Sequence, residues 1–232
     1  MRKILFIICC VAAINQSFGQ TIKFDVEAGA NTSTYAEKES ALSKGIPNFV
    51  YTTDNSWTEG FHAGLLAKTN WRNWALQTGV LYTTKGGDDH VVQQTPGLFF
   101  LEQYGHRKLQ YTEIPLNFTY NIPFDDYNFF IGGGPYMEVI IKGSYNNSYT
   151  FTDYRGTSTG TTSGGVNLPN ESYGIHLMEG VEFKNGFSFN VGYEFGLTNV
   201  ANNGNYIAKN NTIMLSVEYT LFKLKVHHKK ST

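Results

Sequence analysis

FSFNVGYEFGLT, residues 187–198, alternates without interruption between apolar side chains and polar or small ones. The apolar positions run from Phe187 to Leu197 in steps of two, with serine, asparagine, glycine, glutamate and threonine among the residues between and after them. A period of two over this length indicates a β-strand whose two faces meet different surroundings. Seven other stretches show the same kind of pattern, at about residues 21–32, 59–69, 73–85, 108–121, 127–143, 172–184 and 210–222.

The connections between these eight stretches alternate in length. Tight turns at 70–72, 123–126 and 185–186 alternate with long segments rich in Ser, Thr, Asn and Gly, at 33–58, 86–107, 144–171 and 199–209. Short turns at one end and long loops at the other are typical of bacterial outer-membrane barrels, whose tilted strands need roughly 9–11 residues to cross a bilayer. We therefore predict an all-β fold over residues 20–222, an eight-stranded antiparallel transmembrane β-barrel of up-and-down topology, with both termini in the periplasm.

Residues 1–19 have the pattern of a secretory signal peptide. Two basic residues, Arg2 and Lys3, precede an apolar run at 4–14, and small residues at 17–19 predict cleavage before Gln20. The apolar run is too short for a permanent membrane anchor. A lipoprotein, with a lipid on one of the two cysteines at positions 9 and 10, is the alternative. It is disfavoured because Ile8 stands where a small residue is required.

Removing residues 1–19 leaves a chain without cysteine, so neither a disulfide nor thiol chemistry is expected. The full chain carries 18 basic and 19 acidic residues. This balance argues against a nucleic-acid partner. After the signal, no segment has 18 uncharged apolar residues in a row, so no transmembrane helix is predicted. An exported chain of this kind is a soluble protein or a membrane barrel.

A soluble ligand-binding β-barrel would show the same alternation with its apolar face inside. Two features favour the membrane arrangement. The polar face is rich in glycine, which suits the narrow interior of a small barrel. Aromatic residues also gather beside the short turns, as in the girdle at a membrane interface; examples are Trp71, Trp74, Phe118, Tyr120, Phe183, Phe187 and Tyr219.

The polar faces of the predicted strands carry charges of both signs, which must be paired inside a barrel. We predict an interior polar network formed by Glu27, Glu113, Glu138, Glu182, Glu194, Glu218, Lys23, Lys68 and Lys142. Lys85, His62 and His176 fall on the same face. Glu179 departs from the pattern, because strict alternation points it towards lipid; either a β-bulge turns it inward or the assumed register is wrong there.

The long segments are the expected sites of contact with other molecules, since function concentrates where a rigid scaffold presents variable loops. In the segment 86–107, Leu98, Phe99, Phe100 and Tyr104 form an apolar cluster and a candidate contact surface. The segment 144–171 is expected to be mobile.

Several short motifs occur in order along the chain: VEAGAN at 26–31, TEIPL at 112–116, FIGGGPY at 130–136, GVEF at 180–183 and GYEFGLTN at 192–199. In their order and spacing they resemble the PorT-like outer-membrane β-barrel family, over nearly all of residues 21–222. The resemblance implies fold and location and carries no catalytic residues; the founding member of that family is linked to a protein-secretion system. A basic tail at 223–232 follows Phe222 and is expected in the periplasm.

We expect a non-enzymatic integral outer-membrane protein with a structural, binding or secretion-accessory role through its outer loops. No cofactor or metal site is predicted. The expected partners are outer-membrane lipid and lipopolysaccharide, with other envelope or secretion proteins as further candidates, and the chain is expected to be a monomer. A lipid-modifying barrel enzyme is the alternative; it would use His62 or His176 with Ser172 and Glu171.

Overall fold

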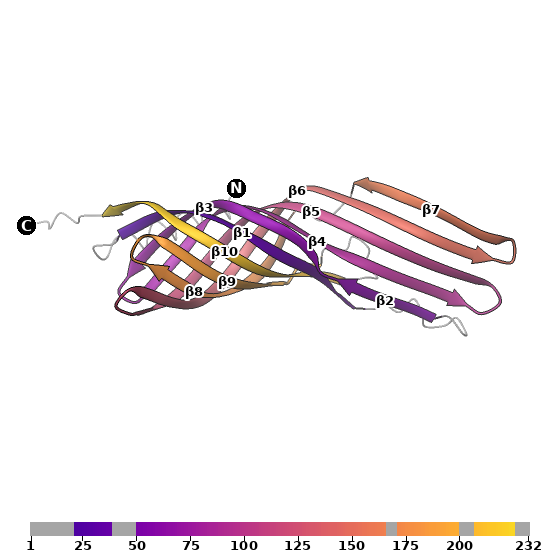
Figure 1. The fold of residues 1–232 in the computed structure, drawn as a ribbon, viewed down its shortest axis with the longest axis horizontal. Coiled ribbons are helices and arrows are strands. Elements are labelled where there is room, and N and C mark those ends of the chain that lie inside the picture. Colours follow the sequence, from indigo (N-terminus) through magenta and orange to yellow (C-terminus); the bar gives the residue numbers. More distant parts are fainter. Residues whose placement is uncertain (1–20, 39–49, 166–170, 200–206, 226–232) are drawn as a thin grey trace, which may run out of the picture.

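The computed structural model describes residues 21–38, 50–165, 171–199 and 207–225, and the predicted signal peptide lies outside them. The described residues form one antiparallel sheet (Figure 1). Its strands are β1 (Thr21–Lys38), β2 (Val50–Ser56), β3 (Thr58–Trp71), β4 (Trp74–Thr95), β5 (Phe99–Pro123), β6 (Tyr127–Asp153), β7 (Gly156–Gly165), β8 (Glu171–Phe183), β9 (Phe187–Gly196) and β10 (Ile207–Lys225). No described helix is long and apolar enough to span a bilayer.

Eight of these strands close into a barrel, as predicted. The first strand, β1, pairs with β3 on one side and with the last strand, β10, on the other. The remaining pairs β3–β4, β4–β5, β5–β6, β6–β8, β8–β9 and β9–β10 complete the ring. Residues 223–225, predicted as the start of the tail, continue β10 instead, and residues 226–232 lie outside the described part.

The strands β4, β5 and β6 continue far beyond the closed barrel (Figure 1). There β2 pairs with β4 and β7 pairs with β6, so a five-stranded sheet projects in the order β2–β4–β5–β6–β7. We call it the projecting sheet. The prediction of loops at 86–107 and 144–171 was therefore wrong. These strands lack the alternation of the barrel because no lipid covers one of their faces, and Ser, Thr and Asn occur on both.

The short connections lie where they were predicted, at the end of the barrel opposite the projecting sheet. The turn before β9 depends on Gly186, whose φ of 94° lies in the left-handed region that favours glycine. The hairpin at the tip of β4 and β5 likewise turns through Gly97, with φ 76°. These turns hold neighbouring strands in antiparallel register.

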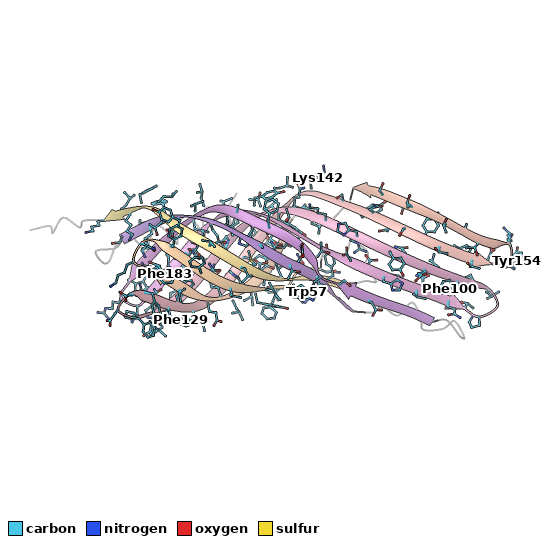
Figure 2. The ribbon with its side chains drawn as sticks, in the orientation of Figure 1. Trp57, Phe100, Phe129, Lys142, Tyr154 and Phe183 are labelled. Atoms are coloured by element: carbon cyan, nitrogen blue, oxygen red, sulfur yellow. The ribbon has the colours of Figure 1, made fainter. Side chains whose placement is uncertain are left out.

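The barrel is apolar outside and polar inside, which is the membrane arrangement rather than that of a soluble barrel. Outward side chains such as Leu65 (62% exposed) and Leu215 (58%) are exposed, whereas Glu194 (0%) and Glu113 (1%) point inward and are buried. Aromatic side chains gather around the short-turn end, where Figure 2 labels Phe129 and Phe183. The ring of Trp74 lies 4.7 Å from that of Phe118 and 4.8 Å from that of Tyr120; Phe187 and Tyr219 are 4.8 Å apart.

Glu179 and Lys142 are charged residues that lie on the outer face of the barrel. Glu179 pairs in unbroken register with Ile131 and Val191 and is exposed, so neither of the two explanations considered for it, a bulge or a wrong register, applies. Lys142, predicted inside, is also exposed, which corrects that assignment (Figure 2). The register between β5 and β6 shifts beside Lys142. Gln110 pairs with Lys142 but Tyr111 pairs with Ile140, so one residue of β6 is left unmatched.

Candidate functional site

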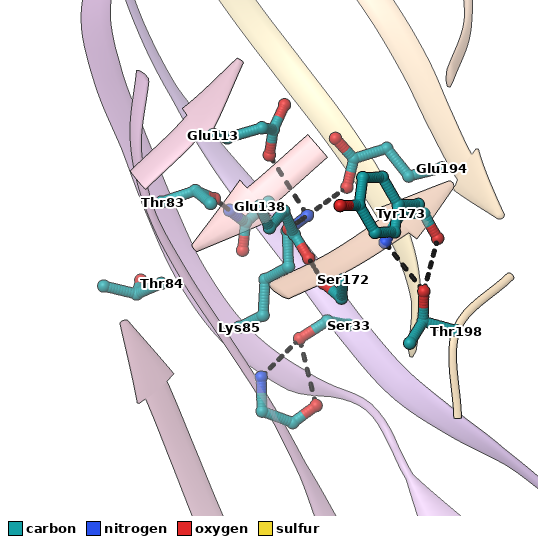
Figure 3. A network of polar contacts seen from close by, with 12 residues as sticks. Ser33, Thr83, Thr84, Lys85, Glu113, Glu138, Ser172, Tyr173, Glu194 and Thr198 are labelled. Atoms are coloured by element: carbon teal, nitrogen blue, oxygen red, sulfur yellow. Dashed lines mark hydrogen bonds and ion pairs between the residues drawn. The ribbon is translucent and has the colours of Figure 1, made fainter. Parts of the chain in front are cut away.

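The centre of the interior network is Lys85 on β4, whose side chain is fully buried. Its ammonium group donates to three carboxylates: Glu113 on β5 at 3.2 Å, Glu138 on β6, and Glu194 on β9 at 2.5 Å (Figure 3). Ser172 on β8 donates to Glu138 at 2.7 Å. Four strands of the wall are thus connected through one cation and a further strand through a hydroxyl. We call Lys85 and its three glutamates the Lys85 cluster.

A second ion-pair group lies nearer the short-turn end. Lys68 on β3 donates to Glu182 on β8 at 2.9 Å, and Lys23 on β1 donates to the other oxygen of the same carboxylate. The Lys68 ammonium also lies 4.8 Å from the centre of the Phe130 ring. These contacts cross the interior, because β8 lies opposite β3 in the ring.

Between these two groups lie two further inward glutamates. The Nε2 atom of His62 is 2.8 Å from the hydroxyl of Ser216 and 3.3 Å from the carboxylate of Glu27. Glu218 accepts a hydrogen bond from Asn190 at 2.8 Å. The interior therefore holds a mixed network in which hydroxyl and amide groups supplement the ion pairs.

The structure places eight of the nine predicted network residues inside the barrel. These are Glu27, Glu113, Glu138, Glu182, Glu194, Glu218, Lys23 and Lys68. Lys142 is outside, and Lys85 is the basic residue that holds three of the glutamates. Sequence alternation placed Lys85 on the inner face, but only the tertiary structure shows that glutamates from three other strands converge on it.

The arrangement suits a cation held by carboxylates. Among the described residues, one group has metal-ligand geometry: oxygens of Glu113, Glu138 and Glu194 lie within 4.8 Å of one another. The ammonium group of Lys85 already contacts all three, so it supplies the positive charge that the carboxylates require. The geometry explains this group as part of the polar filling, without a metal ion.

The residues of the enzymatic alternative do not assemble into a catalytic triad. His62 and His176 are both buried in the interior. The Ser172 hydroxyl donates to the Lys85 cluster, while Glu171 is on the exposed face and accepts a hydrogen bond from Tyr173 at 2.5 Å. Neither ring nitrogen of His176 has a hydrogen-bond partner among the described residues. Ser172 therefore contacts neither histidine, and the serine that His62 contacts is Ser216 in the interior.

The predicted contact cluster at 98–104 is divided by the projecting sheet. Leu98 lies in the tip turn and is 65% exposed. Phe99 and Phe100 are consecutive in β5, so their side chains point to opposite faces, and Phe99 stacks on Phe151 at 6.1 Å. Tyr104 shares a face with Phe100. These residues therefore do not form one patch, because strand geometry separates neighbours that a loop would have allowed to cluster.

The structure shows a groove around Tyr104 that was not apparent from the sequence. Its ring stacks on His90 with 4.3 Å between ring centres, and the groove has a volume of about 550 Å³. The lining includes Ser56, Asp88, His106, Asn146 and Thr161, which come from all five strands of the projecting sheet together with His90 and Tyr104. None of the described residues that line it is a lysine or an arginine.

Glu102 orders the rings beside this groove. Its carboxylate accepts hydrogen bonds from the Tyr104 hydroxyl at 2.9 Å and lies 3.0 Å from Nε2 of His90. The bond from Tyr104, with that from His90, lowers the pKa of Glu102 below its usual value. The same bond raises the pKa of Tyr104, because the phenol donates only while it is protonated. The arrangement is thus maintained at neutral pH.

A match to a known protein family agrees with this architecture. The sequence profile of the family described as "Outer membrane protein beta-barrel domain" matches residues 15–202, and no curated protein matches the sequence. The chain is similar to the crystal structure of Ail, the attachment invasion locus protein of Yersinia pestis, with 13% identity, a TM-score of 0.35 and coverage of 90% of this chain and 100% of that chain.

Two other solved structures are similar. For the outer membrane protein OprG from Pseudomonas aeruginosa, the identity is 13%, the TM-score 0.35, and the coverage 90% of this chain and 97% of that one. For Neisserial surface protein A, the identity is 14%, the TM-score 0.34, and the coverage 85% and 97%. The family profile covers well over half of the sequence, and the strands close into a barrel with an apolar exterior. The chain therefore belongs to the outer membrane protein beta-barrel domain family and is a protein of the cell outer membrane.

Proposed function

We propose that this outer-membrane barrel is not an enzyme and that it works by presenting the projecting sheet as a contact surface outside the cell. The observation that carries the proposal is the groove around Tyr104. It lies on a hydrogen-bonded sheet rather than on isolated loops, so its side chains are already ordered before a partner arrives. A rigid surface loses less conformational entropy on binding than a mobile loop does.

The orientation is part of the proposal. With eight strands, both chain ends lie at the short-turn end, which we assign to the periplasm; a cleaved signal peptide at 1–19 would deliver the chain there. The projecting sheet then faces the exterior. The order of the motifs from VEAGAN to GYEFGLTN supports a place in the PorT-like group and, with it, a role as an accessory to protein secretion; adhesion through the projecting sheet is the other role that we propose.

Removing the parts of β4, β5, β6 and β7 that form the projecting sheet is expected to abolish partner binding without unfolding the barrel. In the shortened variant, Asn-Gly turns join Asp89 to Gly105 and Ser144 to Gly165, which are paired residues. The barrel strands and the three short turns remain. Folding is checked by the migration of unheated and heated samples in gels, and binding by co-purification of envelope proteins from detergent-solubilised outer membranes and by adhesion of whole cells.

The matched control replaces only Tyr154 and Arg155, in the turn between β6 and β7, with Asn-Gly and leaves the sheet intact. It should retain every partner of the full chain. If the shortened barrel folds and still retains the same partners and adhesion, the projecting sheet is not the contact surface and the proposal is wrong.

A lipid-modifying enzyme would change lipid A, whereas a protein that only presents a contact surface would not. We expect the lipid A mass spectrum to be the same in cells that carry the protein, cells that lack it, and cells that carry the His62→Asn, His176→Asn double variant. The reason is that both imidazoles are buried and neither contacts a serine placed for catalysis at the lipid face. An acyl chain lost in the presence of the protein and regained in the double variant would identify an enzyme.

A further inference from the structure

The aromatic ring of Tyr104 has one free face. Tyr104 on β5 pairs with His90 on β4, and their two rings are nearly parallel, with 5° between the ring planes. His90 therefore covers the face of the Tyr104 ring that is turned towards β4. The other face is turned towards β6 and β7, and no other aromatic ring among the described residues packs on it. Tyr104 is 53% exposed as a result.

A row of hydroxyl groups lies beside this free face. Ser148 on β6 pairs with Tyr104, and Thr161 on β7 pairs with Ser148, so the three side chains point to the same face of the sheet. The next row along the strands adds Thr150 and Thr159, which pair with each other. All five residues line a second hollow of about 320 Å³. It adjoins the groove of about 550 Å³, since Tyr104, Ser148 and Thr161 line both.

These hydroxyl groups are available to a ligand. No described residue forms a hydrogen bond with the side chains of Ser148, Thr150, Thr159 or Thr161, and each of these side chains is at least partly exposed. The backbone groups of β5, β6 and β7 already bond to one another within the sheet, so a ligand on this face meets side chains. Each hydroxyl group both donates and accepts hydrogen bonds, which suits a ligand whose own groups do the same.

The groove offers no unpaired charge among the described residues that line it. Its acidic residues are Asp88 and Asp89. Asp88 contacts the imidazole of His106, and Asp89 lies 3.6 Å from the guanidinium group of Arg107. Glu102, beside the groove, is likewise occupied by its two ring partners. An anionic ligand would meet carboxylates without a cation from the lining, and a cationic ligand would have to displace partners that are already in place. The matching ligand is therefore neutral.

We propose that this groove binds a neutral polysaccharide outside the cell. A pyranose ring has a face of C–H groups that packs on an aromatic ring, and a rim of hydroxyl groups that donate and accept hydrogen bonds. One sugar unit stacks on the free face of Tyr104, and its hydroxyl groups bond to Ser148 and Thr161. The larger hollow, whose lining continues towards the barrel through His106 and Asn146, takes further units of the chain.

The inference rests on the proposed function of the projecting sheet and adds the chemical class of the ligand. The hydrogen bond from Tyr104 to Glu102 orients the ring before the ligand arrives, so less conformational entropy is lost on binding. The volume of the groove also lies in the range of small-ligand sites, about 300–1,000 Å³.

The first test exposes the full chain, purified in detergent, to an array of immobilised polysaccharides. The neutral members are glucans, mannans, galactans and xylans, and the anionic members are dextran sulfate, heparin and polygalacturonate. We expect binding to at least one neutral member, with the same affinity at low and high salt, because no ion pair contributes. Binding to no neutral member, or to anionic members alone, would overturn the inference.

The polysaccharide that binds is then titrated calorimetrically against variants of the groove. Tyr104→Ser removes the stacking surface and should weaken binding by about tenfold, whereas Tyr104→Phe keeps the ring and should lose no more than about threefold. Thr161→Val removes one hydroxyl group at nearly constant shape and should lose about fivefold. The matched control is Thr162→Val, because Thr162 is the next residue of β7 and points to the opposite face of the sheet. It should bind as the parent chain does.

Each variant is first shown to be folded by its migration in gels before and after heating. Unchanged binding by Tyr104→Ser, or equal losses in Thr161→Val and Thr162→Val, would show that the polysaccharide binds elsewhere and that the inference is wrong. Its failure is distinguishable from failure of the proposed function. If the shortened barrel loses its partners but the full chain binds no neutral polysaccharide, the projecting sheet contacts another class of molecule and only the present inference fails.

Discussion

Replacing Lys85 with methionine is expected to lower the free energy of unfolding by about 3–5 kcal/mol, the cost of breaking a buried ion pair by removing one partner. Methionine fills a similar volume, so the loss is electrostatic rather than a cavity effect. Three carboxylates would remain, each at most 2% exposed, without the cation that holds Glu113, Glu138 and Glu194 together. Urea unfolding in lipid vesicles, followed by tryptophan fluorescence, measures the change.

Lys142→Met is the matched control, since it removes the same charge from the exposed side of the same barrel. Lys142 forms no ion pair with a described residue, so its replacement should change stability by no more than about 0.5 kcal/mol. Adding Glu113→Gln and Glu138→Gln to Lys85→Met should restore part of the loss, because fewer unpaired charges then remain. Equal stability of the two single lysine variants would show that the Lys85 cluster is not a connected electrostatic unit.

Arginine on the lipid face should lower the stability of the barrel nearly as much as Lys85→Met does, but the loss should differ between positions. Leu65→Arg near the middle of β3 is expected to cost about 2–4 kcal/mol, because a guanidinium has no partner at that depth. Val191→Arg should cost less, since Val191 pairs directly across from the Glu179 carboxyl group, which can neutralise the new charge. Urea unfolding of both variants in the same vesicles checks the order.

Adding Glu179→Leu to each variant tests whether the Glu179 carboxyl group neutralises the arginine at position 191. It should increase the cost of Val191→Arg and leave that of Leu65→Arg unchanged. Gly192→Arg provides a further contrast, because a Cβ atom at Gly192 would lie 2.3 Å from Nε2 of His176 inside the barrel. If Leu65→Arg proves harmless while Leu66→Arg, one residue further and 3% exposed, shows the cost expected of a lipid-facing arginine, the assignment of inner and outer faces is wrong.

The barrel itself could be predicted because a membrane-spanning strand needs a strong alternation of apolar and polar residues in its sequence. One face of each barrel strand meets hydrocarbon and the other meets a polar interior, so alternation alone distinguishes Val191 outside from Gly192 and Glu194 inside. The projecting sheet has no such contrast. Serine and threonine in β7 suit both of its faces, so its strands were indistinguishable from loop residues until their pairing with β6 was known.

For the candidate sites too, some features follow from the sequence and others only from the tertiary structure. Sequence alone determined the number of barrel strands, the position of the short turns and the inward direction of most of the charged residues, since each follows from local periodicity and turn chemistry. Only the tertiary structure decided which charges meet, because Lys85 and Glu194 are brought together by the closure of the barrel and not by spacing along the chain. It also decided that a one-residue bulge turns Lys142 outward and that Glu179 remains on the lipid face, since register depends on the paired strand as well as on the strand itself.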